Sequence, residues 1–159
     1  SAPRESQLNC FQNQILIAKE LDLPIIVHDR QSKGDTLKVL KDMNVTKGVI
    51  HCFSGSAETA KILINMGFMI SFTGVITFKN AKRAIEALKV IPIERLMIET
   101  DSPYMAPEPF RGRRNDSRYV KYVAEKMAEV KGIELEQLCE ITYQNGLKFF
   151  NITKEENIQ

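Results

Sequence analysis

Four short apolar runs alternate with longer segments of helical spacing along the first hundred residues. The runs cover Pro24 to His28, Gly48 to His51, Phe68 to Phe72 and Arg95 to Asp101. Runs of this length, partly β-branched and bounded by proline, glycine or turn formers, predict strands that are buried on both faces. Because the segments between them are long enough for helices, the pattern predicts a parallel sheet with right-handed crossovers.

Apolar residues at helical spacing predict the surrounding helices, over residues 4–20, 35–42, 56–66, 79–90, 119–130 and 135–150. Ser56 is expected to cap the third of these, and Gly67 suits its left-handed end. Residues 102–118 contain three prolines and four arginines, which predicts a long loop after the last strand. Residues 152–159 are expected to form a tail.

Three of the strand runs end in side chains that bind metals. His28 and His51 are the only histidines among 159 residues, and Asp101 closes the fourth run. Parallel α/β folds bind ligands at the carboxyl ends of their strands, so these three side chains are expected at one rim. Two neutral imidazoles and one carboxylate suit Zn²⁺ or Mn²⁺ well, and Mg²⁺ less well because it prefers oxygen ligands.

Length and composition favour a single domain and give little further guidance on function. A chain of 159 residues that is 43% hydrophobic can bury one core but is short for two domains. A net charge of +2 does not by itself indicate nucleic-acid binding. Three cysteines without metal-type spacing favour reduced thiols in a cytoplasmic protein. No apolar stretch approaches the roughly 20 residues that cross a bilayer, so no membrane partner is expected.

Five ordered motifs resemble those of one family. The segments Val49 to Gly55 and Ile98 to Tyr104 closely resemble motifs of the TatD metal-dependent deoxyribonucleases. Residues 24–30, 74–79 and 107–115 match in the same order, and the likeness extends from about residue 4 to 151. It implies a TIM-type (β/α)₈ barrel of the amidohydrolase-like class, with one or two divalent metals at the carboxyl rim.

Carried over by motif, the resemblance implies that His28, His51 and Asp101 are metal ligands. Asp101 would also orient or deprotonate the attacking water in phosphodiester hydrolysis. The His-x-His strand and the metal-bridging glutamate of the family have no counterpart here. The chain therefore resembles the C-terminal half of a TatD protein, and the expected α/β fold is a partial barrel of about four parallel strands.

Half a barrel would expose two strand edges and an apolar face, which are hazards for aggregation. Two alternative partners are expected to cover them. Either two copies associate edge to edge as a homodimer, or an N-terminal fragment accompanies the chain.

Several polar residues near the expected rim are candidates for substrate binding. Arg111 and Arg113 in the 102–118 loop could contact phosphate, although a solvated basic loop is the ordinary explanation of such clusters. Arg30, two residues after His28, has a similar claim. Ser54 is expected to be structural or to contact phosphate, because no spare histidine remains to activate it as a nucleophile.

Three residues beside the expected ligands have alternative roles. Asp101 could instead cap the turn made by Ser102 and Pro103. Glu99 could position a metal ligand or form an interior ion pair, of which the pair is preferred. Cys52 is expected to pack in the core, with thiolate ligation as the alternative.

Three functions remain open from the sequence. The first is hydrolysis of DNA phosphodiester bonds by metal-activated water. The second is a small-molecule hydrolase of the amidohydrolase type, in which the same metal would polarise a carbonyl group. The third is a non-catalytic half-barrel. The loop arginines favour phosphate over a neutral amide.

Overall fold

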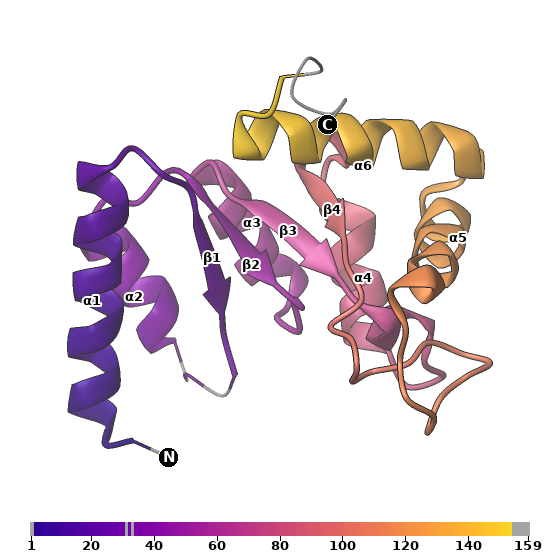
Figure 1. The fold of residues 1–159 in the computed structure, drawn as a ribbon, viewed down its shortest axis with the longest axis horizontal. Coiled ribbons are helices and arrows are strands. Elements are labelled where there is room, and N and C mark those ends of the chain that lie inside the picture. Colours follow the sequence, from indigo (N-terminus) through magenta and orange to yellow (C-terminus); the bar gives the residue numbers. More distant parts are fainter. Residues whose placement is uncertain (1, 31, 33, 154–159) are drawn as a thin grey trace.

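A single parallel sheet organises the chain. The computed structural model describes residues 2–30, 32 and 34–153, so most of the expected tail lies outside the described residues. Its strands are β1 (Ile25–His28), β2 (Gly48–His51), β3 (Met69–Phe72) and β4 (Leu96–Ile98). They are hydrogen-bonded in the order β1-β2-β3-β4, and every neighbouring pair is parallel (Figure 1).

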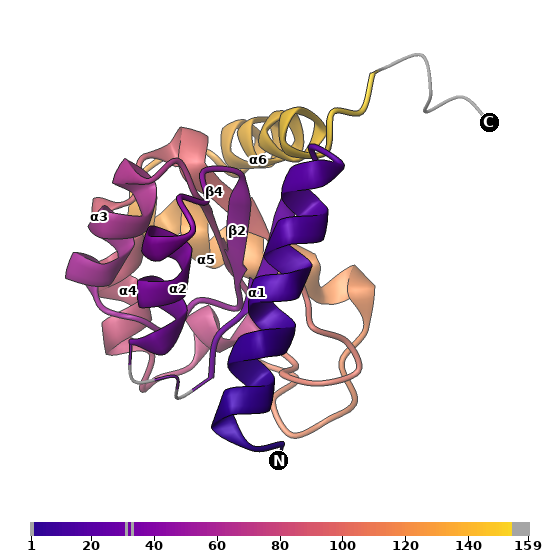
Figure 2. The ribbon, with the colours of Figure 1, turned by 90° about the vertical axis from the view of Figure 1, so that its left-hand side faces the viewer.

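Helices connect and cover these strands, and α2, α3 and α4 gather on one side of the sheet (Figure 2). The helices are α1 (Arg4–Glu20), α2 (Asp35–Asp42), α3 (Ala57–Asn65), α4 (Lys82–Val90), α5 (Val120–Lys131) and α6 (Leu135–Phe150). Short 3₁₀ turns cover Gly74–Thr77, Ile93–Arg95 and Ser117–Tyr119. Ser56 caps α3 as expected, since its hydroxyl accepts the Thr59 N–H at 3.2 Å.

The predicted helix over residues 79–90 begins three residues later than expected. Thr73 accepts the Val75 N–H with its hydroxyl, and this bond opens the 3₁₀ turn Gly74–Thr77 instead. The chain then enters α4 only at Lys82. The segment after β3 is therefore a compact turn at the carboxyl end of the sheet.

The core lies between the sheet and its helices. Phe68, Ile70 and Phe72 are almost fully buried, and Leu40, Leu88 and Met127 pack into the same cluster from the helices. Burying each such side chain contributes about 1.5–3 kcal/mol. All residues of β3 are buried, but in β1 the side chain of Ile26 is 63% exposed. The prediction that every strand is buried on both faces is therefore wrong for β1.

Strand register brings the polar strand-end residues together. His28 pairs directly with His51, and Ser71 pairs with Met97. Because side chains alternate between the two faces of a sheet, His51, Ser71 and Glu99 share one face. The strand β4 ends at Ile98, and Asp101 lies in the following turn instead of on the strand. This corrects the expectation that Asp101 closes the strand itself.

Candidate metal centre

The two histidines are neighbours at the carboxyl ends of β1 and β2. Their ring centroids lie 5.4 Å apart, and the rings are tilted relative to one another. His28 is exposed, whereas the side chain of His51 is only 18% exposed. Within the described part of the chain no hydrogen bond to the His28 ring is found. The pair thus consists of one free and one fixed imidazole.

Glu99 fixes the ring of His51. One carboxylate oxygen, Oε2, bonds to His51 Nδ1, while the other, Oε1, accepts the Cys52 N–H at 2.7 Å and the Ser71 hydroxyl. An ionised carboxylate only accepts hydrogen bonds, so a neutral His51 ring that bonds to it carries its proton on Nδ1 and its lone pair on Nε2. This contact is compatible with both roles expected for Glu99, since it orients the His51 ring and also forms an ion pair if that ring is protonated.

Asp101 faces the free nitrogen of His51. Its Oδ1 lies 3.8 Å from His51 Nε2, and its side chain is 31% exposed. The backbone of Asp101 has φ = 56°, in the left-handed region that side chains seldom adopt. The structure therefore brings His28, His51 and Asp101 to one rim, as the sequence predicts. Across the described residues it forms no group of three or more His, Cys, Asp or Glu side chains close enough to hold a metal.

Cys52 packs beside this centre. Its thiol lies 3.4 Å from the Thr73 hydroxyl and 3.7 Å from the sulfur of Met105. Burial raises the pKa of the Cys52 thiol, and the nearby charges of Glu99 and Asp101 raise it further, against an opposing hydrogen bond from Thr73. A raised pKa keeps the thiol protonated, which favours the packing role over thiolate ligation.

The 102–118 loop is irregular, as expected, and is fastened to the turn after β3. The Thr77 hydroxyl accepts the Glu108 N–H at 2.9 Å. A side chain on Gly74 would lie 2.2 Å from the Met105 carbonyl oxygen, so the loop backbone passes directly over this glycine. Further along, the Phe110 ring stacks on Tyr119 with centroids 4.3 Å apart. The loop therefore has a defined position at the rim.

The substrate-binding candidates are all exposed at or beyond strand ends. The Arg111 guanidinium lies 4.3 Å above the Phe78 ring. Arg113 is exposed in the same loop, Arg30 is exposed after β1, and Ser54 is exposed after β2. Arg118 is committed elsewhere, because it pairs with Asp116 at 2.9 Å. Of these candidates, Arg111 is the one whose guanidinium is oriented by a described contact.

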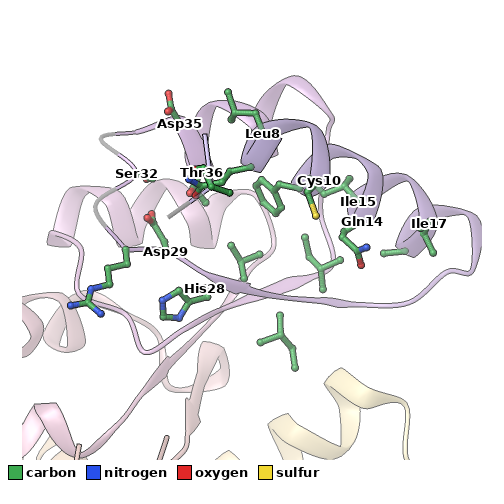
Figure 3. Close-up of a pocket in the computed structure, with 18 of the residues that line it drawn as sticks. Leu8, Cys10, Gln14, Ile15, Ile17, His28, Asp29, Ser32, Asp35 and Thr36 are labelled. Atoms are coloured by element: carbon green, nitrogen blue, oxygen red, sulfur yellow. Dashed lines mark hydrogen bonds between the residues drawn. The ribbon is translucent and has the colours of Figure 1, made fainter. Parts of the chain in front are cut away.

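A wide groove of about 1410 Å³ opens between α1 and β1, beside His28. Figure 3 shows His28 and Asp29 at this groove, with Leu8, Cys10, Ile15 and Ile17 of α1 along it. Its apolar lining is exposed, at 63% for Ile26 and 54% for Leu23. The expected open edge of the sheet is therefore present on the β1 side.

Two residues of the centre were not singled out by sequence reasoning. Ser71 is a polar residue within an apolar strand, and this pattern could have marked it as the partner of another polar group. In the structure its side chain is only 5% exposed. Asn115 is 4% exposed and bonds to the turn that carries Asp101. Asn115 ends the 107–115 segment that resembles the family motif, but nothing in that segment indicates its contact with the turn.

Comparison with known proteins shows which family the chain belongs to. The family profile described as TatD related DNase matches residues 1–151. This chain belongs to the TatD family. The uncharacterized metal-dependent hydrolase YabD of Bacillus subtilis (strain 168) is 47% identical over 153 residues, covering 95% of this chain and 60% of that protein. The uncharacterized metal-dependent hydrolase YcfH of Escherichia coli (strain K12) is 45% identical, covering 92% and 56% respectively.

Solved TatD structures share the fold. The TatD homolog YJJV of Escherichia coli K12 superposes with a TM-score of 0.87 at 27% identity, covering 94% of this chain and 58% of that one. A TatD family hydrolase of Entamoeba histolytica gives 0.84 at 26% identity, covering 96% and 59%. The predicted class, a partial TIM-type barrel of four parallel strands, is confirmed. The chain spans 56 to 60% of the length of these four relatives.

The helices give no indication of a membrane span. Of those in the described ranges, none is both long enough and apolar enough to cross a bilayer.

Proposed function

We propose that this chain forms part of a metal-dependent hydrolase that cleaves phosphodiester bonds in DNA with activated water. One observation carries the proposal: Glu99 holds the Nδ1 side of His51, so that Nε2 faces Asp101 at 3.8 Å beside the ring of His28. Membership of the TatD family and the names of its relatives, metal-dependent hydrolases, support it.

The chemical types of the donors suit a divalent metal, although the three side chains are not gathered closely enough in this structure to hold one among the described residues. A histidine ligand ordinarily donates its second ring N–H to a carboxylate, and His51 already does so to Glu99. His28 and Asp101 add a second imidazole and a carboxylate on the same rim. His28, His51 and Asp101 would hold the ion, with Zn²⁺, Mn²⁺ and Mg²⁺ as the candidate metals.

Each residue then has a defined part in hydrolysis. A metal bound here would lower the pKa of water and polarise a phosphoryl oxygen. Asp101, half-exposed at the rim, orients the attacking water and accepts its proton at a carboxylate oxygen. Glu99 keeps the proton of His51 on Nδ1 throughout, so that Nε2 stays a lone-pair donor.

Arginines supply the preference for phosphate. The Arg111 guanidinium lies over the Phe78 ring and is exposed, so it remains available for a phosphate group. Arg113, Arg30 and Ser54 are exposed around the same end of the sheet and can add contacts to the nucleic-acid backbone. A neutral amide substrate would gain nothing from these cations, which is why DNA is favoured over the amidohydrolase alternative.

A second candidate is the non-catalytic half-barrel, and the open β1 side favours it. His28 lies exposed beside a groove with an exposed apolar lining. A partner that covers this groove, as a second copy or an N-terminal fragment, would enclose His28. Without such cover, the β1 side of the centre stays open to solvent.

A cleavage assay tests these functions. The purified chain is incubated with end-labelled DNA, an RNA of the same sequence, a nitrophenyl phosphodiester and a dipeptide amide, each with Mn²⁺, Mg²⁺ or Zn²⁺. We expect metal-dependent DNA cleavage that falls at least about 100-fold in His51→Ala. Arg111→Ala should raise the KM for DNA but not for the small phosphodiester. Amide cleavage alone would overturn the DNA proposal, and no cleavage would favour the half-barrel.

We also propose a cytoplasmic location. The three cysteines, Cys10, Cys52 and Cys139, are free thiols, as suits a reducing compartment. Fractionation of the cells that produce the chain would test this, and recovery outside the cytoplasm would contradict it.

A further inference from the structure

Asp101 lies in a turn that needs support from elsewhere. Its φ of 56° places the backbone in the left-handed region, a conformation that persists only where the surroundings determine it. Its carboxylate approaches His51, but within the described ranges no hydrogen bond to that carboxylate is found. Within the turn, the Tyr104 N–H donates to the Asp101 carbonyl at 2.9 Å, and the Ser102 N–H and hydroxyl both donate to the Thr100 hydroxyl, at 3.4 and 3.1 Å. The backbone of the turn therefore sets the position of the carboxylate.

Asn115 joins the two ends of this turn with a single amide group. Its Nδ2 donates to the Thr100 carbonyl at 2.7 Å and to the Tyr104 carbonyl at 2.6 Å. Its own N–H donates to the Pro103 carbonyl at 2.9 Å. Asn115 is only 4% exposed, so water cannot readily replace these bonds.

The loop itself does not depend on Asn115 for its attachment. Its middle is held by the bond from Glu108 to Thr77, and the stack of Phe110 on Tyr119 holds the part that follows. The two Nδ2 bonds go instead to the residue before Asp101 and to a residue three positions after it. The Asn115 side chain thus acts on the turn of the candidate metal ligand.

We propose that Asn115 is a positioning residue for Asp101: it holds the 100–104 turn so that the Asp101 carboxylate faces His51 Nε2. The role deepens the proposed function and rests on it, since it assigns to Asn115 the geometry of one metal ligand. Asn115 itself touches neither metal nor substrate in this role.

The chain provides a matched control in Asn145. Its Nδ2 also donates to two carbonyls, of Ile93 at 2.9 Å and Leu96 at 2.8 Å, but at the opposite end of β4. Asn115→Ala and Asn145→Ala remove the same number of Nδ2 bonds, so both should lower the thermal midpoint. We expect only Asn115→Ala to weaken Mn²⁺ binding, by about 10–100-fold in a calorimetric titration.

A metal-free measurement separates the inference from the proposed function. In the NMR spectrum without metal, Asn115→Ala should shift the Asp101 backbone signals out of the left-handed range and speed amide exchange of Tyr104. Asn145→Ala should change neither. If the unaltered chain binds no Mn²⁺, the proposed function fails while this comparison still decides the role of Asn115 in the turn.

Two outcomes would overturn the inference. The first is an unchanged Asp101 backbone in Asn115→Ala, and the second is equal loss of Mn²⁺ affinity in both variants. Should Asn115→Ala fail to fold, Asn115→Asp gives the same test, because it keeps the size and the acceptor oxygen for the Asp116 N–H, 2.8 Å away, but loses the amide donors. Normal Asp101 signals and normal Mn²⁺ affinity in that variant would equally refute the role.

Discussion

The two edges of the sheet, at β1 and at β3–β4, differ in how firmly they hold the side chains of the candidate metal centre. On the β3–β4 side, Glu99 has three hydrogen-bond partners and the 102–118 loop is fastened to Gly74 and Thr77. On the β1 side, His28 is exposed and Ile26 is 63% exposed beside a wide groove (Figure 3). The difference teaches that preorganisation in this chain is local: hydrogen bonds hold His51 and Glu99, whereas His28 is exposed.

The largest expected effect on stability comes from disrupting the contact between Gly74 and the 102–118 loop. In Gly74→Ala the new methyl group would lie 2.2 Å from the Met105 carbonyl oxygen and 2.8 Å from the Pro107 nitrogen. Because both are backbone atoms, the loop must move, and we expect a loss of about 1–3 kcal/mol in the free energy of unfolding. Urea titration measures this loss.

Gly146→Ala is the control for that substitution. It lies inside α6 with no atom within 4 Å of the added methyl group. Alanine in a helix interior should raise stability by about 0.5–1 kcal/mol. Similar stabilities of the two variants would mean that the contact between Gly74 and the loop is not tight.

The next largest expected effect is on the tautomer and the metal affinity of His51. In Glu99→Gln the amide oxygen can still accept from Cys52 and Ser71, which turns the amide NH₂ toward His51 Nδ1. The proton of the ring should then move to Nε2, the atom that faces Asp101. We expect the other neutral tautomer in ¹⁵N NMR of the metal-free chain, and Mn²⁺ affinity lower by about 10–100-fold.

Glu125→Gln, on the exposed face of α5, makes the same chemical change away from the centre and should alter neither measurement. If the His51 tautomer stays the same in Glu99→Gln, Glu99 does not determine which nitrogen is free.

A smaller effect on stability is expected on the open side. Ile26→Lys places a charge on the edge strand β1, where the side chain is already exposed. The free energy of unfolding of the monomer should change by no more than about 0.5 kcal/mol. Self-association in sedimentation velocity should nevertheless fall, because charged residues on an edge strand oppose pairing.

Val90→Lys, at the end of α4 and 38% exposed, is the comparison for that charge and should leave association unchanged. A chain that is monomeric at every concentration before substitution would contradict association through the β1 edge.

The sequence predicted the parts of the molecule that depend on local periodicity. The four strands and six helices appear in the predicted order, and α6 has the predicted bounds Leu135–Phe150, whereas α4 begins three residues late and β4 ends before Asp101. His28 and His51 could be placed at one rim in advance, because both end a strand and parallel strands align their carboxyl ends; their direct pairing is found in the structure. These features can be predicted from the residue pattern within each element and from the alignment of parallel strands at their carboxyl ends.

Other features depend on contacts between distant residues and have no local pattern. Glu99 contacts His51, which lies 48 positions earlier in the chain, so no local pattern could identify this partner. Asn115 acts on carbonyl groups 15 and 11 positions before it. The exposure of Ile26 follows from the position of β1 at the edge of the sheet, which an apolar run cannot reveal.

The smallest expected effect compares one carboxylate on each side. Hydrogen bonds from Arg4 lower the pKa of Asp35 on the open side, and hydrogen bonds from Arg118 lower the pKa of Asp116 in the loop. A pKa that is lower in the folded than in the unfolded chain stabilises the fold above about pH 4, and this contribution is lost as the pH falls through the folded pKa. Carboxyl NMR titrations should therefore show both pKa values rising in Arg4→Ala and Arg118→Ala respectively.

Salt should separate these two carboxylates. The Arg4–Asp35 pair joins α1 to α2 through side-chain bonds alone, with the Arg4 charge exposed, whereas Asp116 also accepts the Arg118 backbone N–H at 2.9 Å. Because dissolved ions screen exposed charges, 1 M NaCl, with a screening length of about 3 Å, should raise the pKa of Asp35 more than that of Asp116. Equal shifts would mean that the backbone bond does not protect Asp116, and the loop side would then be no more firmly held at its surface than the open side.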